Sequence, residues 1–91
     1  MVVKKKILIV DDEESFGKLV KLNLEETGEY EVRVETKGMR AVPVAREFKP
    51  DFILLDVVMP DMDGGDVAQQ LKGDKELKGI PVGFLTALVS E

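Results

Sequence analysis

Apolar and charged positions along the chain predict four strands. Residues Lys5–Val10 and 52–55 form short, continuous apolar runs, which are typical of strands buried on both faces of a parallel sheet. Residues 30–36 alternate apolar and charged side chains, which predicts a strand with one polar face at a sheet edge. A fourth strand is predicted over 80–85, where Gly83 indicates a close approach by another backbone.

Three helices are predicted between these strands, over residues 15–27, 38–48 and 66–72. Gly28 is the expected stop of the first helix, and Pro43 should kink or shorten the second because it removes a backbone donor. Residues 59–65 hold a proline and two glycines and predict a loop. The order βαβαβαβ predicts an α/β fold with a parallel sheet and right-handed crossovers.

Composition narrows the classes of function. The 91 residues correspond to one domain, 1–91. The sequence has no histidine and no cysteine, which excludes Ser-His catalysis, disulfides and metal sites built on those side chains. A net charge of −5 disfavours direct nucleic-acid binding and favours a basic partner or a divalent cation. Because no apolar run is long enough for a secretory signal or a membrane span, we expect a cytoplasmic protein without a membrane partner.

Acidic and hydroxyl side chains follow the predicted strands. Asp11 and Asp12 come directly after the first strand, Asp56 after the third, and Thr86 after the fourth. Ligands of open α/β sheets bind at these carboxyl ends, so the carboxylates should converge if the first and third strands are neighbours. Like charges this close favour a cation, and Mg²⁺ suits oxygen ligands. A carboxylate is also a nucleophile toward phosphorus, and Thr86 would donate its hydroxyl to a phosphoryl oxygen.

Each of these residues also has a plain structural interpretation. Asp11 or Asp12 alone would serve equally well as the N-cap of the following helix. A lone threonine after a strand, such as Thr86, is more often structural, and Met59 and Met62 are predicted to pack within their loop. The conjunction of several such residues at the ends of successive strands favours the functional interpretation.

Three sequence strings resemble a response-regulator receiver domain: VDDE at 10–13, DVVMPDMDG at 56–64 and FLTA at 84–87. The resemblance implies a flavodoxin-like, doubly wound parallel sheet of strand order 2-1-3-4, as in chemotaxis receivers, with the fifth strand and last helix missing. The chain would then be a receiver domain incomplete at its C-terminus. It would be either a fragment or a protein that pairs its open fourth-strand edge with a second copy as a homodimer.

The resemblance also implies a role for each site residue. Asp56 would accept the phosphoryl group and contact Mg²⁺. Asp12 would bind Mg²⁺ directly, and Asp11 directly or through water. Val58 would offer its backbone carbonyl to the metal ion, and Thr86 would be the switch hydroxyl that follows the phosphoryl group.

The implied function is that of a signalling module in a two-component system, not of a turnover enzyme. A sensor histidine kinase would donate its phosphoryl group to Asp56. The alternative is a receiver-like binding or assembly module with impaired phosphorylation, because no residue here matches the lysine that the family places after a fifth strand. An aspartyl-phosphate phosphatase needs a second aspartate where this chain has Val58, and a dinucleotide-binding domain needs a G-x-G-x-x-G string after the first strand.

Overall fold

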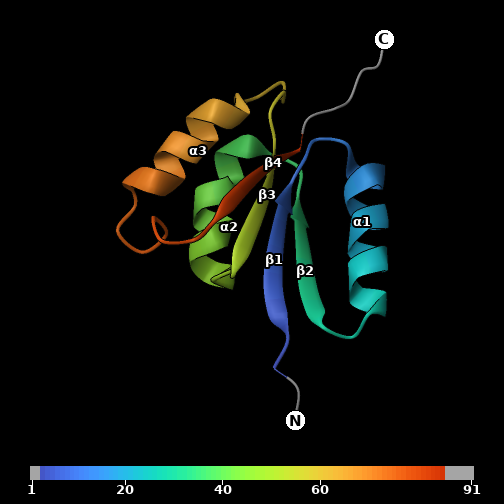
Figure 1. The fold of residues 1–91 in the computed structure, drawn as a ribbon. Helices are drawn as coiled ribbons and strands as arrows, with labels where there is room; N and C mark the ends of the chain where they lie inside the picture. Colours follow the sequence, from blue (N-terminus) through green and yellow to red (C-terminus); the bar gives the residue numbers. More distant parts are fainter. Residues whose placement is uncertain (1–2, 86–91) are drawn as a thin grey trace.

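A computed structural model describes residues 3–85, which form a four-stranded parallel sheet with helices on both faces (Figure 1). The strand order β2-β1-β3-β4 confirms the predicted order 2-1-3-4 and places β2 at an edge. None of the helices in the described range has the length and apolar character needed to cross a membrane. The elements in chain order are β1 (Lys5–Val10), α1 (Glu14–Glu26), β2 (Tyr30–Glu35), the 3₁₀ turn η1 (Gly38–Arg40), α2 (Ala41–Phe48), β3 (Phe52–Asp56), α3 (Gly64–Gly73) and β4 (Val82–Leu85).

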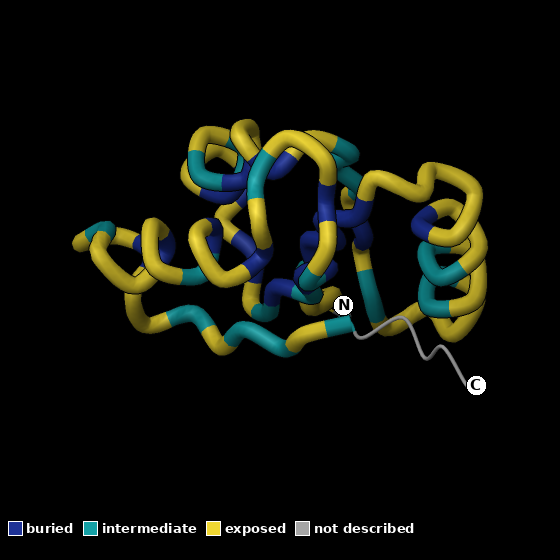
Figure 2. The backbone as a smooth tube through the Cα atoms, turned by 90° about the horizontal axis from the view of Figure 1, so that it is seen from above, coloured by how far each residue is buried: buried dark blue, intermediate teal, exposed yellow. Residues whose placement is uncertain are grey.

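The larger core lies between the sheet and the helices α2 and α3, which cover one face together (Figure 1). Leu8 of β1, with Ile53 and Leu55 of β3, is fully buried on this side. Burying each such side chain contributes roughly 1.5–3 kcal/mol. Figure 2 shows the buried positions gathered between the layers. The helices and the segments beside them contribute Ala41, Ala45, Phe48, Met59, Val67, Leu71 and Leu77.

The face that carries α1 has a smaller core. Its buried residues are Ile7, Ile9 and Val32, all from β1 and β2. Phe52 and Leu54 of β3 point to the same side but are only half-buried. The expectation that residues 52–55 are buried on both faces is therefore wrong for this face among the described residues, because α1 packs over β1 and β2.

The second predicted helix is divided. Gly38–Arg40 forms the turn η1, and the α-helix begins at Ala41. Pro43 lies in the first turn of α2, where backbone donors have no partner inside the helix in any case. The proline thus shortens the regular helix, which is one of the two outcomes expected for it.

The third helix begins earlier than expected. Gly64 and Gly65 belong to α3, so the predicted loop over 59–65 and the predicted helix start at 66 are both wrong by two residues. The Gly64 N–H donates a 2.8 Å hydrogen bond to the Val57 carbonyl. A Cβ on Gly64 would lie 2.3 Å from the Asp56 carbonyl oxygen, so only glycine allows α3 to start against the end of β3.

The fourth strand begins at Val82, two residues later than expected. Pro81, just before it, has no N–H to donate, although its carbonyl accepts a 3.0 Å hydrogen bond from Ile53. Gly83 is closely approached, as predicted, but by a side chain. A Cβ there would lie 2.9 Å from Cζ of the Phe52 ring, so the expected backbone neighbour is wrong.

Candidate functional site

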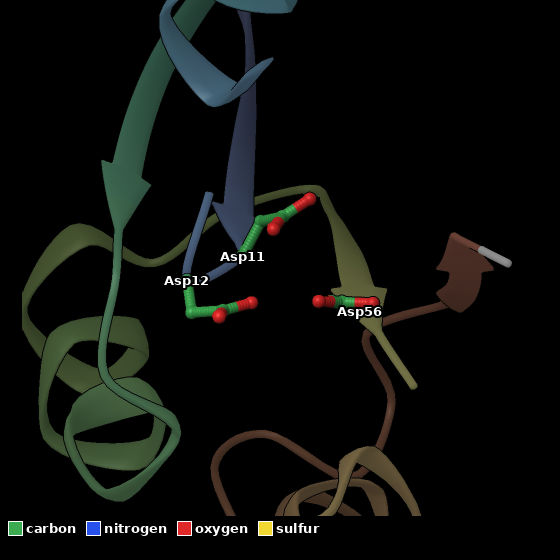
Figure 3. Close-up of side chains that lie close together, drawn as sticks. All are labelled: Asp11, Asp12 and Asp56. Carbon is green, nitrogen blue, oxygen red and sulfur yellow. The ribbon is translucent and has the colours of Figure 1, made fainter. Parts of the chain in front are cut away.

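Asp11, Asp12 and Asp56 meet at the C-terminal edge of the sheet, as predicted from the sequence. The strands β1 and β3 are neighbours, with Val10 paired to Leu55, so the residues that end or follow these strands lie side by side. One carboxylate oxygen from each aspartate lies within 4.8 Å of the others. Figure 3 shows the Asp12 and Asp56 side chains facing one another, with Asp11 beside them.

The three aspartates differ in burial. Asp11 is 5% exposed and Asp56 is 9% exposed, whereas Asp12 is exposed to solvent. Asp11 Oδ1 accepts a 2.9 Å hydrogen bond from the Glu13 N–H, which fixes the turn into α1. The N-cap of α1 is Glu13, so the helix-cap interpretation of Asp11 and Asp12 is wrong.

Burial raises the pKa of Asp56, and the negative charge of Asp11 raises this pKa further, with a smaller contribution from Asp12. The Val58 N–H, 3.4 Å from Asp56 Oδ1, acts in the opposite direction because it stabilises the ionised carboxylate. The ionised site is thus short of positive charge, which a cation would supply.

The donor set fits Mg²⁺. Three carboxylates supply hard oxygen atoms, and a divalent ion would offset the repulsion that raises the pKa of Asp56. The Val58 side chain is 77% exposed, and its backbone N–H faces Asp56. The metal-binding role of the Val58 carbonyl stays a prediction. Thr86 lies outside the described residues, so its switch role stays a prediction as well.

A cavity of about 260 Å³ opens beside the acidic cluster. Asp11 and Asp56 form its polar side, and Phe16 and Leu85 contribute apolar side chains. Neither apolar residue is among the predicted site residues. Phe16 belongs to the apolar pattern of the predicted helix 15–27, and in the structure it is 42% exposed. Its position at the first turn after the acidic residues is the signal that would have placed it here.

Asp61 is a further residue of this region that was not predicted. Its carboxylate accepts hydrogen bonds from the backbone N–H groups of Gly38 and Met39, at 3.2 and 3.0 Å. No local pattern reveals a contact between residues more than 20 positions apart, and an aspartate after Pro60 is typical of an ordinary turn.

Comparisons with known proteins place these features in a family. The family model of the response regulator receiver domain matches residues 7–91. The alkaline phosphatase synthesis transcriptional regulatory protein PhoP of Bacillus subtilis is 45% identical over 85 residues, which cover 93% of this chain and 34% of the relative. The DNA-binding dual master transcriptional regulator RpaA of Synechocystis is 41% identical over 83 residues, 91% of this chain and 34% of the relative. The chain thus spans about a third of the length of these two relatives.

Solved structures of response regulators have the same fold. The chemotaxis response regulator CheY4 of Vibrio cholerae superposes with a TM-score of 0.86 at 31% identity, covering 97% of this chain and 72% of that one. The residues 7–91 that the family model matches include Asp11, Asp12 and Asp56. The chain belongs to the response regulator receiver domain family.

Proposed function

We propose that this protein accepts a phosphoryl group on Asp56 from the phosphohistidine of a sensor histidine kinase, with Mg²⁺ held by the acidic cluster. The observation that carries the proposal is the convergence of three carboxylates at the ends of β1 and β3, with oxygen atoms within 4.8 Å of one another. Family membership adds support, since response regulator receivers are regulatory modules. The protein would act as an acceptor in a phosphorelay and not as a turnover enzyme.

The chain's own residues have distinct parts in this transfer. An Asp56 carboxylate oxygen would bond to phosphorus while the donor's P–N bond breaks, which leaves an acyl phosphate on Asp56. The Val58 N–H, 3.4 Å from Oδ1, orients the carboxylate for that attack. Asp11 and Asp12 would hold Mg²⁺, which supplies the positive charge that an anion needs to react with another anion. The Val58 carbonyl and the Thr86 hydroxyl would complete the contacts to the metal ion and the phosphoryl group.

The alternative, a phosphorylation-impaired binding module, is not favoured. A degenerate site would have no reason to keep Asp11 and Asp56 nearly buried and close to one another, because that arrangement raises the pKa of Asp56 and costs stability. This burial and proximity support the proposal of a cation-assisted acceptor.

Two further expectations stay proposals. The cytoplasmic location predicted from the sequence is one of them. The other is a homodimer through β4, which within residues 3–85 pairs with β3 on one side. Phe84 of this strand is 51% exposed, so a second copy would cover apolar surface as well as strand edge. Sedimentation velocity across a concentration series tests the dimer, and a monomer at all concentrations would contradict it.

The experiment that tests the proposed function is phosphorylation by acetyl phosphate with Mg²⁺, followed by intact mass. We expect one added phosphoryl group in the original chain and none in Asp56→Asn or in the presence of a chelator. Asp66→Asn, which removes an exposed carboxylate from α3, is the matched control and should be phosphorylated normally. A folded chain that gains no phosphoryl mass would overturn the proposal.

A further inference from the structure

Asp61 joins two loops on the side of the sheet that carries the acidic cluster. It lies in the loop 57–63, between β3 and α3, and it reaches the turn η1 that follows β2. Oδ1 accepts the Gly38 N–H at 3.2 Å, and Oδ2 accepts the Met39 N–H at 3.0 Å. One carboxylate thus takes two consecutive backbone amides, one on each oxygen. These hydrogen bonds, Met39 first, lower the pKa of Asp61 and favour its ionised form.

The two loops are also in direct contact. A Cβ on Gly38 would lie 3.1 Å from Cβ of Met62 and 3.2 Å from Cε of Met59. Gly38 is itself buried, and Met59 is only 6% exposed. The absence of a side chain at Gly38 therefore allows the close approach, and Asp61 supplies the polar bonds that hold it.

The same loop contacts the proposed phosphoacceptor at its other end. The Val58 N–H donates to Asp56 Oδ1 at 3.4 Å, and the Gly64 N–H closes the loop onto the Val57 carbonyl at 2.8 Å. Both bonds stay within the segment from β3 to α3. Among the described residues, the hydrogen bonds that tie this loop to an element other than β3 and α3 are those of Asp61.

We propose that Asp61 is a positioning residue that clamps loop 57–63 to η1 and thereby keeps the backbone of Val58 in place beside Asp56. This inference rests on the proposed function, because it concerns the loop that borders the proposed acceptor. The clamp acts through the loop backbone, so Asp61 itself need touch neither the metal ion nor the phosphoryl group. Without it, the loop loses its hydrogen bonds to η1, so the backbone of the exposed Val58 is held less firmly beside Asp56.

Two substitutions of Asp61 test this. Asp61→Ala removes both hydrogen bonds, whereas Asp61→Asn keeps one acceptor oxygen and places its NH₂ group against the second backbone donor. The asparagine variant should therefore have an intermediate effect. Because Asp61 is exposed, neither change should prevent folding, and a thermal melt checks this. Asp66→Asn, which loses the same charge five residues further along without losing a hydrogen bond of the structure, is the matched control.

Two measurements report on the clamp without requiring phosphorylation. The first is amide hydrogen exchange at Gly38, Met39 and Val58. We expect Asp61→Ala to accelerate exchange at all three amides by about tenfold, because two charge-assisted bonds are lost. The second is binding of Mn²⁺, a spectroscopic substitute for Mg²⁺, followed by electron paramagnetic resonance. We expect the dissociation constant to rise by about three- to tenfold in Asp61→Ala and less in Asp61→Asn.

The outcomes separate this inference from the proposed function. If the original chain binds Mn²⁺ but gains no phosphoryl group, the proposed function fails, and the exchange and Mn²⁺ data still decide the role of Asp61. If Asp61→Ala accelerates exchange at Gly38 and Met39 while Val58 and the Mn²⁺ affinity stay unchanged, Asp61 is only a local staple and the inference is overturned. It is also overturned if Asp66→Asn weakens Mn²⁺ binding equally, or if the original chain binds no Mn²⁺.

Discussion

The Glu25 carboxylate on α1 accepts a 3.0 Å hydrogen bond from the backbone N–H of Val32 in the edge strand β2. The Val32 carbonyl accepts a 2.8 Å hydrogen bond from Lys21, and the Lys21 and Glu25 side chains form an ion pair at 3.3 Å. A residue in a parallel strand directs its N–H and C=O to the same side, and those of Val32 point away from β1. One ion pair therefore satisfies both edge-facing backbone groups in the middle of β2.

Removing this pair is predicted to open β2 to another strand. An unpaired edge is a template for pairing between molecules, and native proteins cover such edges. We expect Lys21→Ala combined with Glu25→Ala to strengthen self-association by about threefold or more. Sedimentation velocity over a range of concentrations would measure the change as a rising weight-average sedimentation coefficient.

The same helix offers a matched control for that experiment. Glu14 and Lys18 form a second ion pair with the same spacing and the same 3.3 Å distance, but with no bond to the sheet. Replacing both with alanine should leave the association state as it was. An equal increase in the two double variants would mean that lost surface charge, and not the opened strand edge, is responsible.

Self-association through β2 should also depend on pH. The hydrogen bond from Val32, followed by the contacts with Lys21, lowers the pKa of Glu25. A group with a lowered pKa in the folded state contributes stability above its unfolded pKa and loses that contribution as the pH falls through the folded value. We therefore expect association in the original chain to increase as the pH falls below the ordinary range of a glutamate pKa. In Glu25→Gln this increase in association at low pH should be absent. Light scattering measured from pH 6 to pH 3 compares the original chain with the variant.

Asp56→Asn is predicted to stabilise the metal-free protein. Burial and the charge of Asp11 raise the pKa of Asp56, so its ionised form is disfavoured in the folded state. The cost is present above the folded pKa and disappears at low pH, where Asp56 is protonated in both states. We expect a gain on the order of 1 kcal/mol in the free energy of unfolding at pH 7, and none near pH 3. Urea denaturation in the presence of a chelator measures the free energy of unfolding at each pH. An equal gain at pH 7 and near pH 3 would contradict the electrostatic cause.

Gly64→Ala is predicted to destabilise the fold strongly. The added Cβ would meet the Asp56 carbonyl oxygen at 2.3 Å and the Val57 Cα at 2.8 Å, and backbone atoms cannot rotate away. We expect a loss of about 2–4 kcal/mol in the free energy of unfolding. Gly73→Ala, at the other end of α3, meets nothing within 4 Å and should be neutral or stabilising by up to about 1 kcal/mol. Similar losses of stability in both variants would show that the close contact at Gly64 is not the cause of the destabilisation.

The order of the elements follows from sequence patterns because each segment carries its own periodicity, whereas the strand order 2-1-3-4 was implied by the resemblance to receiver domains. The runs at Lys5–Val10 and 52–55 predict two buried strands. The resemblance implies that these strands are neighbours, as the structure confirms, and the rule that strand ends converge then places Asp11 and Asp56 together. The acidic cluster was predicted for the same reason, since its residues directly follow the strongest strand signals.

The features that were not predicted depend on contacts between distant segments. Gly64 begins α3 although glycine disfavours helices, because the end of β3 leaves no space for a side chain there. Leu54 was expected to be buried but is half-buried, because α1 packs over β1 and β2 and does not cover β3. The bonds of Asp61 to Gly38 and Met39 join residues 23 and 22 positions apart, which no local pattern encodes.

The central place of β1 has a consequence for the order in which the protein folds during synthesis. Of the four described strands, β1 is synthesised first, but it lies between β2 and β3, and the Lys6 N–H bonds to Asp51, which is 45 residues further along. At about 5–20 residues per second, roughly 2–9 s pass before β3 follows β1 out of the ribosome. Leu8 and Ile9, which are fully buried in the folded protein, therefore stay without their neighbours in β3 during this time. Nascent β1 therefore exposes apolar side chains to aggregation until β3 emerges, and its pairing with β3 completes the centre of the sheet.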